Sequence, residues 1–171
     1  MSVRFVIDPL DFVRKAGEHH GKIRLADLER IQDFLYENKG EVSYRVIGAL
    51  DQNNKPCLHI QVAGEIYLNC QRCLGGLSHM LDINTSLLLV ETENELVQMD
   101  RDGTVDAVLA TVDMDVTDLI EDEIILSLSI SSRHNEGECE IHDPERYKAR
   151  QDAESENPFA ALEALKKDRV K

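Results

Sequence analysis

The sequence predicts an α+β fold, in which an antiparallel meander sheet packs with helices in a single domain and a helical tail follows at the C-terminus. Three observations indicate this class. The chain has 171 residues, which is about the length of one domain. Apolar residues follow a period of two through the middle of the chain and a period of three to four on either side. The predicted domain spans 1–145, and a linker with a basic helix spans 146–171.

Composition restricts the kind of protein further. Apolar residues make up 42% of the chain and charged residues 30%. Because no uninterrupted apolar run is long enough to cross a bilayer, we expect no membrane contact. The first 25 residues contain three acidic side chains and no continuous apolar segment, which predicts neither a secretory signal nor a transit peptide. We therefore expect a cytoplasmic protein.

The excess negative charge lies in one segment. The chain carries 19 basic and 33 acidic side chains, which gives a net charge of −14 at pH 7. Residues 91–145 contain 2 basic against 17 acidic side chains, whereas 146–171 contain 7 basic and 5 acidic ones. A general positive field that would wrap nucleic acid is therefore not expected. We expect 91–145 to present one acidic surface.

The N-terminal part is predicted to contain a strand and two helices. An apolar run over 3–7 predicts the strand, and helical spacing over 9–13 predicts a short helix after it. Five apolar residues then recur at intervals of three and four, which predicts an amphipathic helix that ends at 38–40. These residues are Leu25, Leu28, Ile31, Phe34 and Leu35.

Alternation of apolar and polar residues predicts three strands of a meander. It begins over 42–46 and resumes over 58–69 after a turn-rich segment. One face of the second strand is polar, which is typical of an antiparallel strand with one side in water. Gly64 lies in the middle of that strand and predicts a bulge. The same period returns over 77–89.

The acidic segment is predicted to contain a strand and a helix. Residues 91–106 show no strong element, and 105–111 predicts a short edge strand. From 115 to 128 the apolar residues share one helical face, and the carboxylates of 121–123 are expected to face solvent. Residues 124–130 also alternate, which leaves a strand as the alternative to the helix that we favour.

The C-terminal segment is predicted to end in a short basic helix. Asn157 and Pro158 form a cap with a proline in the first turn, and Phe159 begins an apolar stripe. The clustered cations of this helix include Lys166, Lys167 and Arg169.

A Cys-Gln-Arg-Cys turn indicates a metal site. Cys70 and Cys73 lie at the end of a predicted strand, and two thiolates three residues apart can chelate one tetrahedral metal. His134 and Cys139 follow the acidic helix with the spacing of the second half of a mixed Cys and His site. If the four residues bind one structural zinc ion, the fold must bring them together.

Two other interpretations of the cysteines remain open. They are either free thiols or a redox pair, since a redox dithiol has the same spacing as Cys70 and Cys73. Two glycines follow at once and disfavour the helix that a redox motif needs. Cys57, at the start of a strand, is expected to be a buried thiol. No phosphate loop, nucleophile elbow or zinc-protease motif occurs in the sequence, so an enzyme that uses Cys70 and Cys73 is only the alternative to a non-catalytic protein.

Several of these stretches, in this order along the chain, resemble the YceD family of large-ribosomal-RNA accumulation proteins. They are Cys-Gln-Arg-Cys at 70–73, Glu-Asp-Glu-Ile-Ile-Leu at 121–126, His134 with Cys139, and Asn-Pro-Phe-Ala at 157–160. Relatives in that family carry further cysteines after the acidic helix, whereas this chain has His134 at the first of those places and only Cys139 later.

The resemblance implies a non-catalytic ribosome biogenesis factor that supports synthesis, processing or stability of 23S ribosomal RNA. Its implied partners are a ribosomal precursor particle and, on that particle, a basic ribosomal protein or an rRNA-processing factor. The negative charge favours protein contact over direct RNA contact, because counterion release needs clustered cations. Candidate contact residues are Glu121, Asp122, Glu123, Asn157, Pro158, Phe159, Lys166, Lys167 and Arg169.

Overall fold

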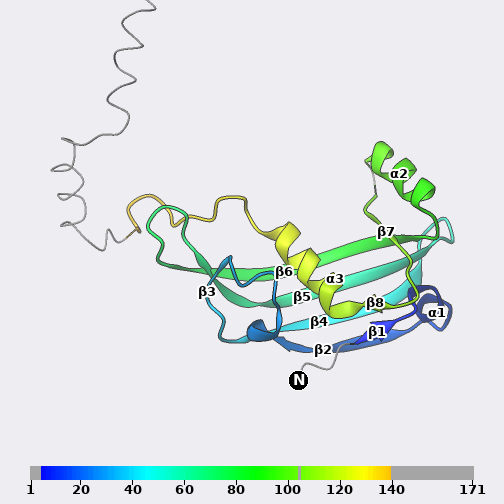
Figure 1. Cartoon of the computed structure of the whole chain (residues 1–171), viewed down its shortest axis with the longest axis horizontal. Coiled ribbons are helices and arrows are strands. Elements are labelled where there is room, and N and C mark those ends of the chain that lie inside the picture. Colours follow the sequence, from blue (N-terminus) through cyan, green and yellow to red (C-terminus); the bar gives the residue numbers. More distant parts are fainter. Residues whose placement is uncertain (1–4, 104, 140–171) are drawn as a thin grey trace, which may run out of the picture. The chain divides into compact units, whose positions relative to one another are not determined.

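The computed structural model describes residues 5–103 and 105–139 (Figure 1). Residues 1–134 form one unit of the chain and 135–171 form a second, of which 135–139 are described. The elements are β1 (Val6–Ile7), α1 (Pro9–Arg14), β2 (Glu18–Arg24), the 3₁₀ helix η1 (Leu25–Asp27), β3 (Leu35–Glu37), β4 (Glu41–Leu50), β5 (Pro56–Asn69), β6 (Gly76–Val90), α2 (Glu93–Asp102), β7 (Ala107–Leu109), β8 (Met114–Asp115) and α3 (Val116–Ser127).

One sheet organises the first unit. Its strand order is β2-β4-β5-β6-β7, and β3 pairs with β5 beside this path. The antiparallel pairs β4–β5 and β5–β6 form the predicted meander, and the short strand β7 runs parallel to β6 at its edge. A second, two-stranded sheet joins β1 to β8. Helix α3 lies across one face of the large sheet, over β5 and β6 (Figure 1). The α+β class is confirmed.

The core lies between this sheet face and α3. Most of the period-two residues of the three long strands and most of the apolar stripe of α3 are buried, as their patterns predict. Tyr44, Leu77 and Leu128 are half-buried. A helix rather than a strand therefore forms over residues 116–127. The central residues of the core are Val42, Val46, Leu58, Ile60, Val62, Ile66, Ile120 and Ile124.

The predicted bulge at Gly64 is wrong. Gly64 pairs with Leu81 in an unbroken register between β5 and β6. A Cβ at this position would lie 3.0 Å from Val42 Cγ1 and 3.2 Å from Val42 Cα. The glycine therefore allows β4 to approach β5 closely and does not mark an extra residue.

The predicted helix over residues 25–35 is also wrong, although its apolar residues are buried. The segment forms a single 3₁₀ turn, further turns and then β3. Leu25, Leu28 and Ile31 are 0% exposed. The Gln32 side-chain amide donates to the Leu25 carbonyl at 2.6 Å and to the Leu28 carbonyl at 2.5 Å. Side chains thus satisfy backbone groups that a helix would have paired.

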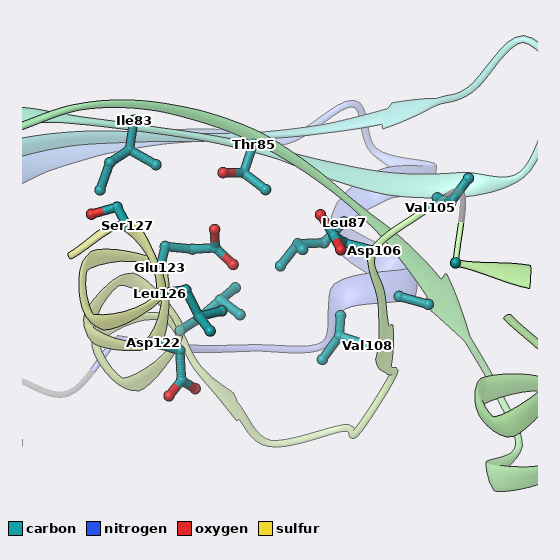
Figure 2. Close-up of a pocket in the computed structure, with 13 residues that line it drawn as sticks. Ile83, Thr85, Leu87, Val105, Asp106, Val108, Asp122, Glu123, Leu126 and Ser127 are labelled. Carbon is teal, nitrogen blue, oxygen red and sulfur yellow. The ribbon is translucent and has the colours of Figure 1, made fainter. Parts of the chain in front are cut away.

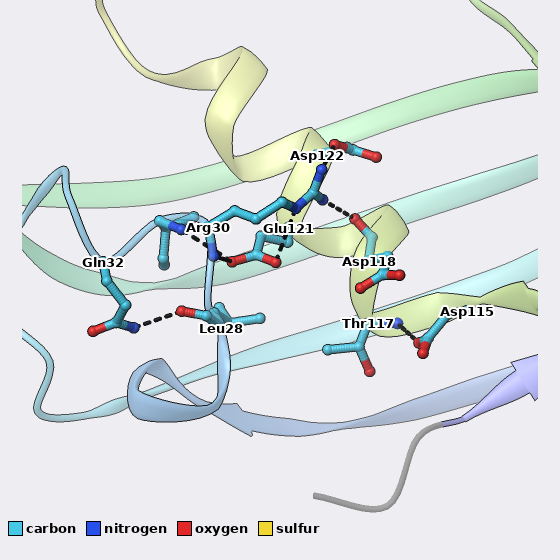
Figure 3. A network of polar contacts seen from close by, with 9 residues as sticks. Leu28, Arg30, Gln32, Asp115, Thr117, Asp118, Glu121 and Asp122 are labelled. Carbon is cyan, nitrogen blue, oxygen red and sulfur yellow. Dashed lines mark hydrogen bonds and ion pairs between the residues drawn. The ribbon is translucent and has the colours of Figure 1, made fainter.

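Glu121 of α3 also accepts hydrogen bonds from backbone groups of the segment 25–35 that a helix would have paired (Figure 3). Its carboxylate accepts hydrogen bonds from the backbone N–H groups of Arg30 at 2.5 Å and Ile31 at 3.0 Å, and from Arg30 Nε at 3.2 Å. Arg30 Nη1 also donates to Asp122 at 2.6 Å. Glu121 is 3% exposed and Glu123 6% exposed, so the expectation that the acidic face of α3 is wholly solvated is wrong.

Helix α2 occupies a segment for which no element is predicted. Thr92 caps it by accepting a hydrogen bond from the Glu95 N–H, and the Glu95 carboxylate accepts one from the Glu91 N–H. At the other end Gly103 has φ +59° and donates to the Met99 carbonyl. Capping at both ends stabilises a helix that lacks a strong apolar face.

Several predictions fall outside the described residues. They are the boundary at residues 145–146 and the terminal helix with Asn157, Pro158, Phe159, Lys166, Lys167 and Arg169. Among the helices that the structure does describe, none combines the length and the apolar character needed to span a bilayer.

Candidate metal centre and acidic face

Cys70 and Cys73 lie in the tight loop that joins the two longest strands, β5 and β6. The Leu74 N–H donates to the Cys70 carbonyl at 2.8 Å, and the Cys70 N–H donates to the Gly75 carbonyl at 2.9 Å. Leu74 adopts φ +60°, the left-handed conformation that such a reversal requires. The loop therefore presents its two thiols from a short turn held by the sheet.

The segment after α3 runs to this loop. The Gln71 N–H donates to the Ser132 carbonyl at 2.9 Å, and Arg72 Nη2 donates to the His134 carbonyl at 3.3 Å. These bonds place the His134 ring beside the thiols, with Nδ1 at 3.4 Å from Cys73 Sγ.

The four predicted ligands lie together. The ligand atoms of Cys70, Cys73, His134 and Cys139 are all within 4.8 Å of one another. Cys70 is buried and the other three are half-buried. Two sulfur ligands of one tetrahedral zinc ion lie about 3.8 Å apart. The predicted convergence is confirmed, and the cluster is compatible with a structural metal site.

The Cys70 thiol is held as a thiolate. Burial by itself raises the pKa of this group, but backbone N–H groups of Cys73, His134 and Arg72 donate to the sulfur, and the resulting pKa is about 5. At neutral pH the side chain therefore carries the negative charge that a metal ligand needs.

The His134 ring is oriented for ligation through Nδ1. Its Nε2 lies 3.0 Å from the Gly76 carbonyl oxygen, which can only accept, so this nitrogen is the donor. In a neutral imidazole the lone pair is then on Nδ1, the atom that faces Cys73. Metal-binding histidines commonly donate their other N–H to a backbone carbonyl in this way.

The donor set fits zinc, and the full burial of Cys70 disfavours a redox role for this thiol. Three thiols and one imidazole are typical ligands of a closed tetrahedral zinc site. A redox dithiol needs an accessible nucleophilic sulfur, whereas Cys70 is 0% exposed. Cys57 is separate: it is buried as expected, its Sγ donates to the Ala49 carbonyl, and burial raises its pKa.

The acidic candidates on α3 lie in three different environments. Glu121 is bound to the segment around Arg30. Asp122 pairs with Arg30 on the surface, and its side chain is 52% exposed. Glu123 is turned toward the sheet, where the Thr85 hydroxyl donates to it. A hollow of about 430 Å³ beside Asp122 is lined by six acidic residues and one basic residue, Arg30.

A known protein family matches more than half of the chain. The family model described as large ribosomal RNA subunit accumulation protein YceD matches residues 58–166. The match begins within β5 and includes the Cys70–Cys73 loop, α3, His134 and Cys139. No solved structure matches the chain.

Proposed function

The chain belongs to the YceD family, and on that basis we propose that it is a non-catalytic cytoplasmic factor of ribosome biogenesis that supports accumulation of 23S ribosomal RNA. The observation that carries the proposal is the family match, which covers both the cysteine loop and the acidic helix.

The chemistry of the cysteine cluster supports a structural role. We propose that Cys70, Cys73, His134 and Cys139 hold one Zn²⁺, which joins the β5–β6 loop to the chain after α3. Four protein ligands leave no open position for a substrate, whereas catalytic zinc keeps one. The buried thiolate and the tautomer of His134 support this assignment.

The charge distribution supports protein partners on a ribosomal precursor particle. We propose that the acidic surface around α3 contacts a basic ribosomal protein or an rRNA-processing factor. Complementary charge raises the rate at which two such proteins associate, and added salt lowers that rate by screening the charges. Lys166, Lys167 and Arg169, near the predicted cap at Asn157, are proposed as a second contact.

The function is tested by measuring the ratio of 23S to 16S ribosomal RNA in cells. We expect deletion of the gene to lower this ratio and the intact gene to restore it. A gene truncated before Asn157 forms a third arm: a normal ratio there removes the terminal segment from the proposal. An unchanged ratio in the deletion strain contradicts the proposed function itself.

A further inference from the structure

A groove of about 660 Å³ lies between α3 and the segment that leads into β7, and β6 forms its floor (Figure 2). Leu119 and Leu126 line it from α3, and Ile83 and Leu87 line it from β6. Leu126 is 78% exposed, although it belongs to a helix that otherwise covers the core. The groove thus offers apolar surface that no described residue covers completely.

Carboxylates surround this apolar floor. Asp106, Asp122 and Glu123 all line the groove, and among the described residues that line it none is Lys or Arg. Figure 2 shows the Glu123 carboxylate turned toward Thr85 and the interior of the groove. Burial raises the pKa of Glu123, and the charges of Asp106 and Asp122 raise it further. A cation in the groove would offset this repulsion.

The floor strand also has an open edge. On one side β6 pairs with β5 from Gly76 to Leu88. On the other side, within the part of the chain that the structure describes, it pairs only with β7, over Leu88–Val90. The stretch Ile83–Leu87, which lines the groove, therefore has backbone groups on that edge that no described strand pairs. Such an edge is a template for an added strand.

We propose that this groove binds an extended segment of a basic partner protein, which pairs with β6 along Ile83–Leu87 and directs a Lys or Arg side chain to Asp106 and Glu123. The aliphatic stem of that side chain packs on Leu126 while its charged end reaches the carboxylates. Side chains alternate across a strand, so every second residue of the segment faces the groove. The inference rests on the proposed contact with a basic protein, and it adds where and in what conformation that protein binds.

The test uses the full-length protein and a fluorescent peptide of about ten residues, a usual strand length, in which lysine alternates with valine. Binding is measured by fluorescence anisotropy at an ionic strength of about 0.15 M. We expect Asp106→Asn combined with Glu123→Gln to weaken binding at least about tenfold. The matched control, Asp82→Asn with Glu93→Gln, removes the same charge. Asp82 lies on β6 outside the groove lining and Glu93 on α2, so this control should bind as the wild type does.

A second variant does not depend on a buried residue. Leu126→Lys adds a positive charge at the groove on an already exposed side chain, so it should fold normally and bind the peptide about tenfold more weakly. In NMR spectra of isotope-labelled wild-type protein, the backbone amide signals of Ile83–Leu87 should shift when the peptide binds.

Three results overturn the inference. The first is failure of the wild-type protein to bind the peptide. The second is equal weakening in the groove variant and its control, which would show a diffuse charge effect. The third is tighter binding of a single-stranded RNA of similar length at the same residues. None of these results changes the 23S to 16S ratio in the deletion strain, so failure of the groove and failure of the proposed function are distinguishable.

Discussion

At the scale of single residues, the cysteine cluster predicts a defined metal content. Protein purified without chelator should contain about one equivalent of zinc, and Cys70→Ser should lose it, because the remaining donors no longer close a tetrahedral site. Cys57→Ser is the matched control, since Cys57 donates to Ala49 outside the cluster and its loss should leave the zinc in place. Elemental analysis of the three proteins checks this.

Two results would contradict the zinc assignment. Wild-type protein with less than about a tenth of an equivalent contains only contamination. Equal zinc loss in Cys57→Ser would show that general misfolding, and not a missing ligand, releases the metal.

Removal of metal from the wild-type protein should also lower its Tm, because the ion binds the folded state.

Cys70 also predicts how stability depends on pH in metal-free protein. The pKa of its thiol is lowered from 9.0 to about 5 in the folded state. Between these values the unfolded chain binds one proton more than the folded protein does, so stability from this group is full above about pH 9 and is lost as the pH falls toward 5. The Tm difference between chelator-treated wild type and Cys70→Ser should therefore grow with pH over this range. A constant difference contradicts the prediction.

At the scale of elements, one carboxylate joins α3 to the segment around Arg30. Glu121→Ala removes the acceptor of two backbone N–H groups and of Arg30 Nε, and it should lower the free energy of unfolding by about 3 kcal/mol. The control, Glu29→Ala, changes the same residue type at an exposed neighbouring position and should cost less than about 0.5 kcal/mol.

Urea unfolding of both variants measures these two costs. If Glu121→Ala and Glu29→Ala unfold at the same urea concentration, the contact does not hold the segment. A different result is that Glu121→Ala speeds hydrogen exchange in residues 28–34 without lowering the free energy of global unfolding. That result would show that the contact stabilises only a local unit.

The same elements show why local patterns succeed at some places and fail at others. Apolar spacing predicts β5 and α3 because each buries a face of its own. It fails over residues 25–35, where the acceptor that replaces helical bonds is Glu121, 91 positions from Arg30. Apolar spacing misses helix α2 for a different reason. The sequence signal of this helix is the pair Thr92 and Glu95 at capping-box spacing, and apolar periodicity does not detect caps.

At the scale of the whole molecule, the sequence predicts the cluster of cysteines and histidine better than it predicts the surroundings of the acidic residues on α3. The ligand types and spacing of Cys70, Cys73, His134 and Cys139 predict convergence, and the structure brings them together. Helical phase alone places Glu121 among the solvated acids, and its burial depends on the distant loop that packs against α3. Glu123 is different, because it follows Leu119 by four residues and Ile120 by three and so lies on the apolar stripe, where the helical pattern could have predicted its burial.

The pairing of β1 with β8 sets an order of events during synthesis. Val6 and Ile7 pair with Asp115 and Met114, and the Val116 N–H donates to the Phe5 carbonyl. While a ribosome makes this chain at roughly 5–20 residues per second, β1 must wait several seconds until β8 leaves the exit tunnel. The β4–β5–β6 meander can form in that interval, because its neighbours are consecutive. Strand β1, made before the other described strands, is therefore among the last of them to be paired, and a nascent-chain chaperone would meet it unpaired.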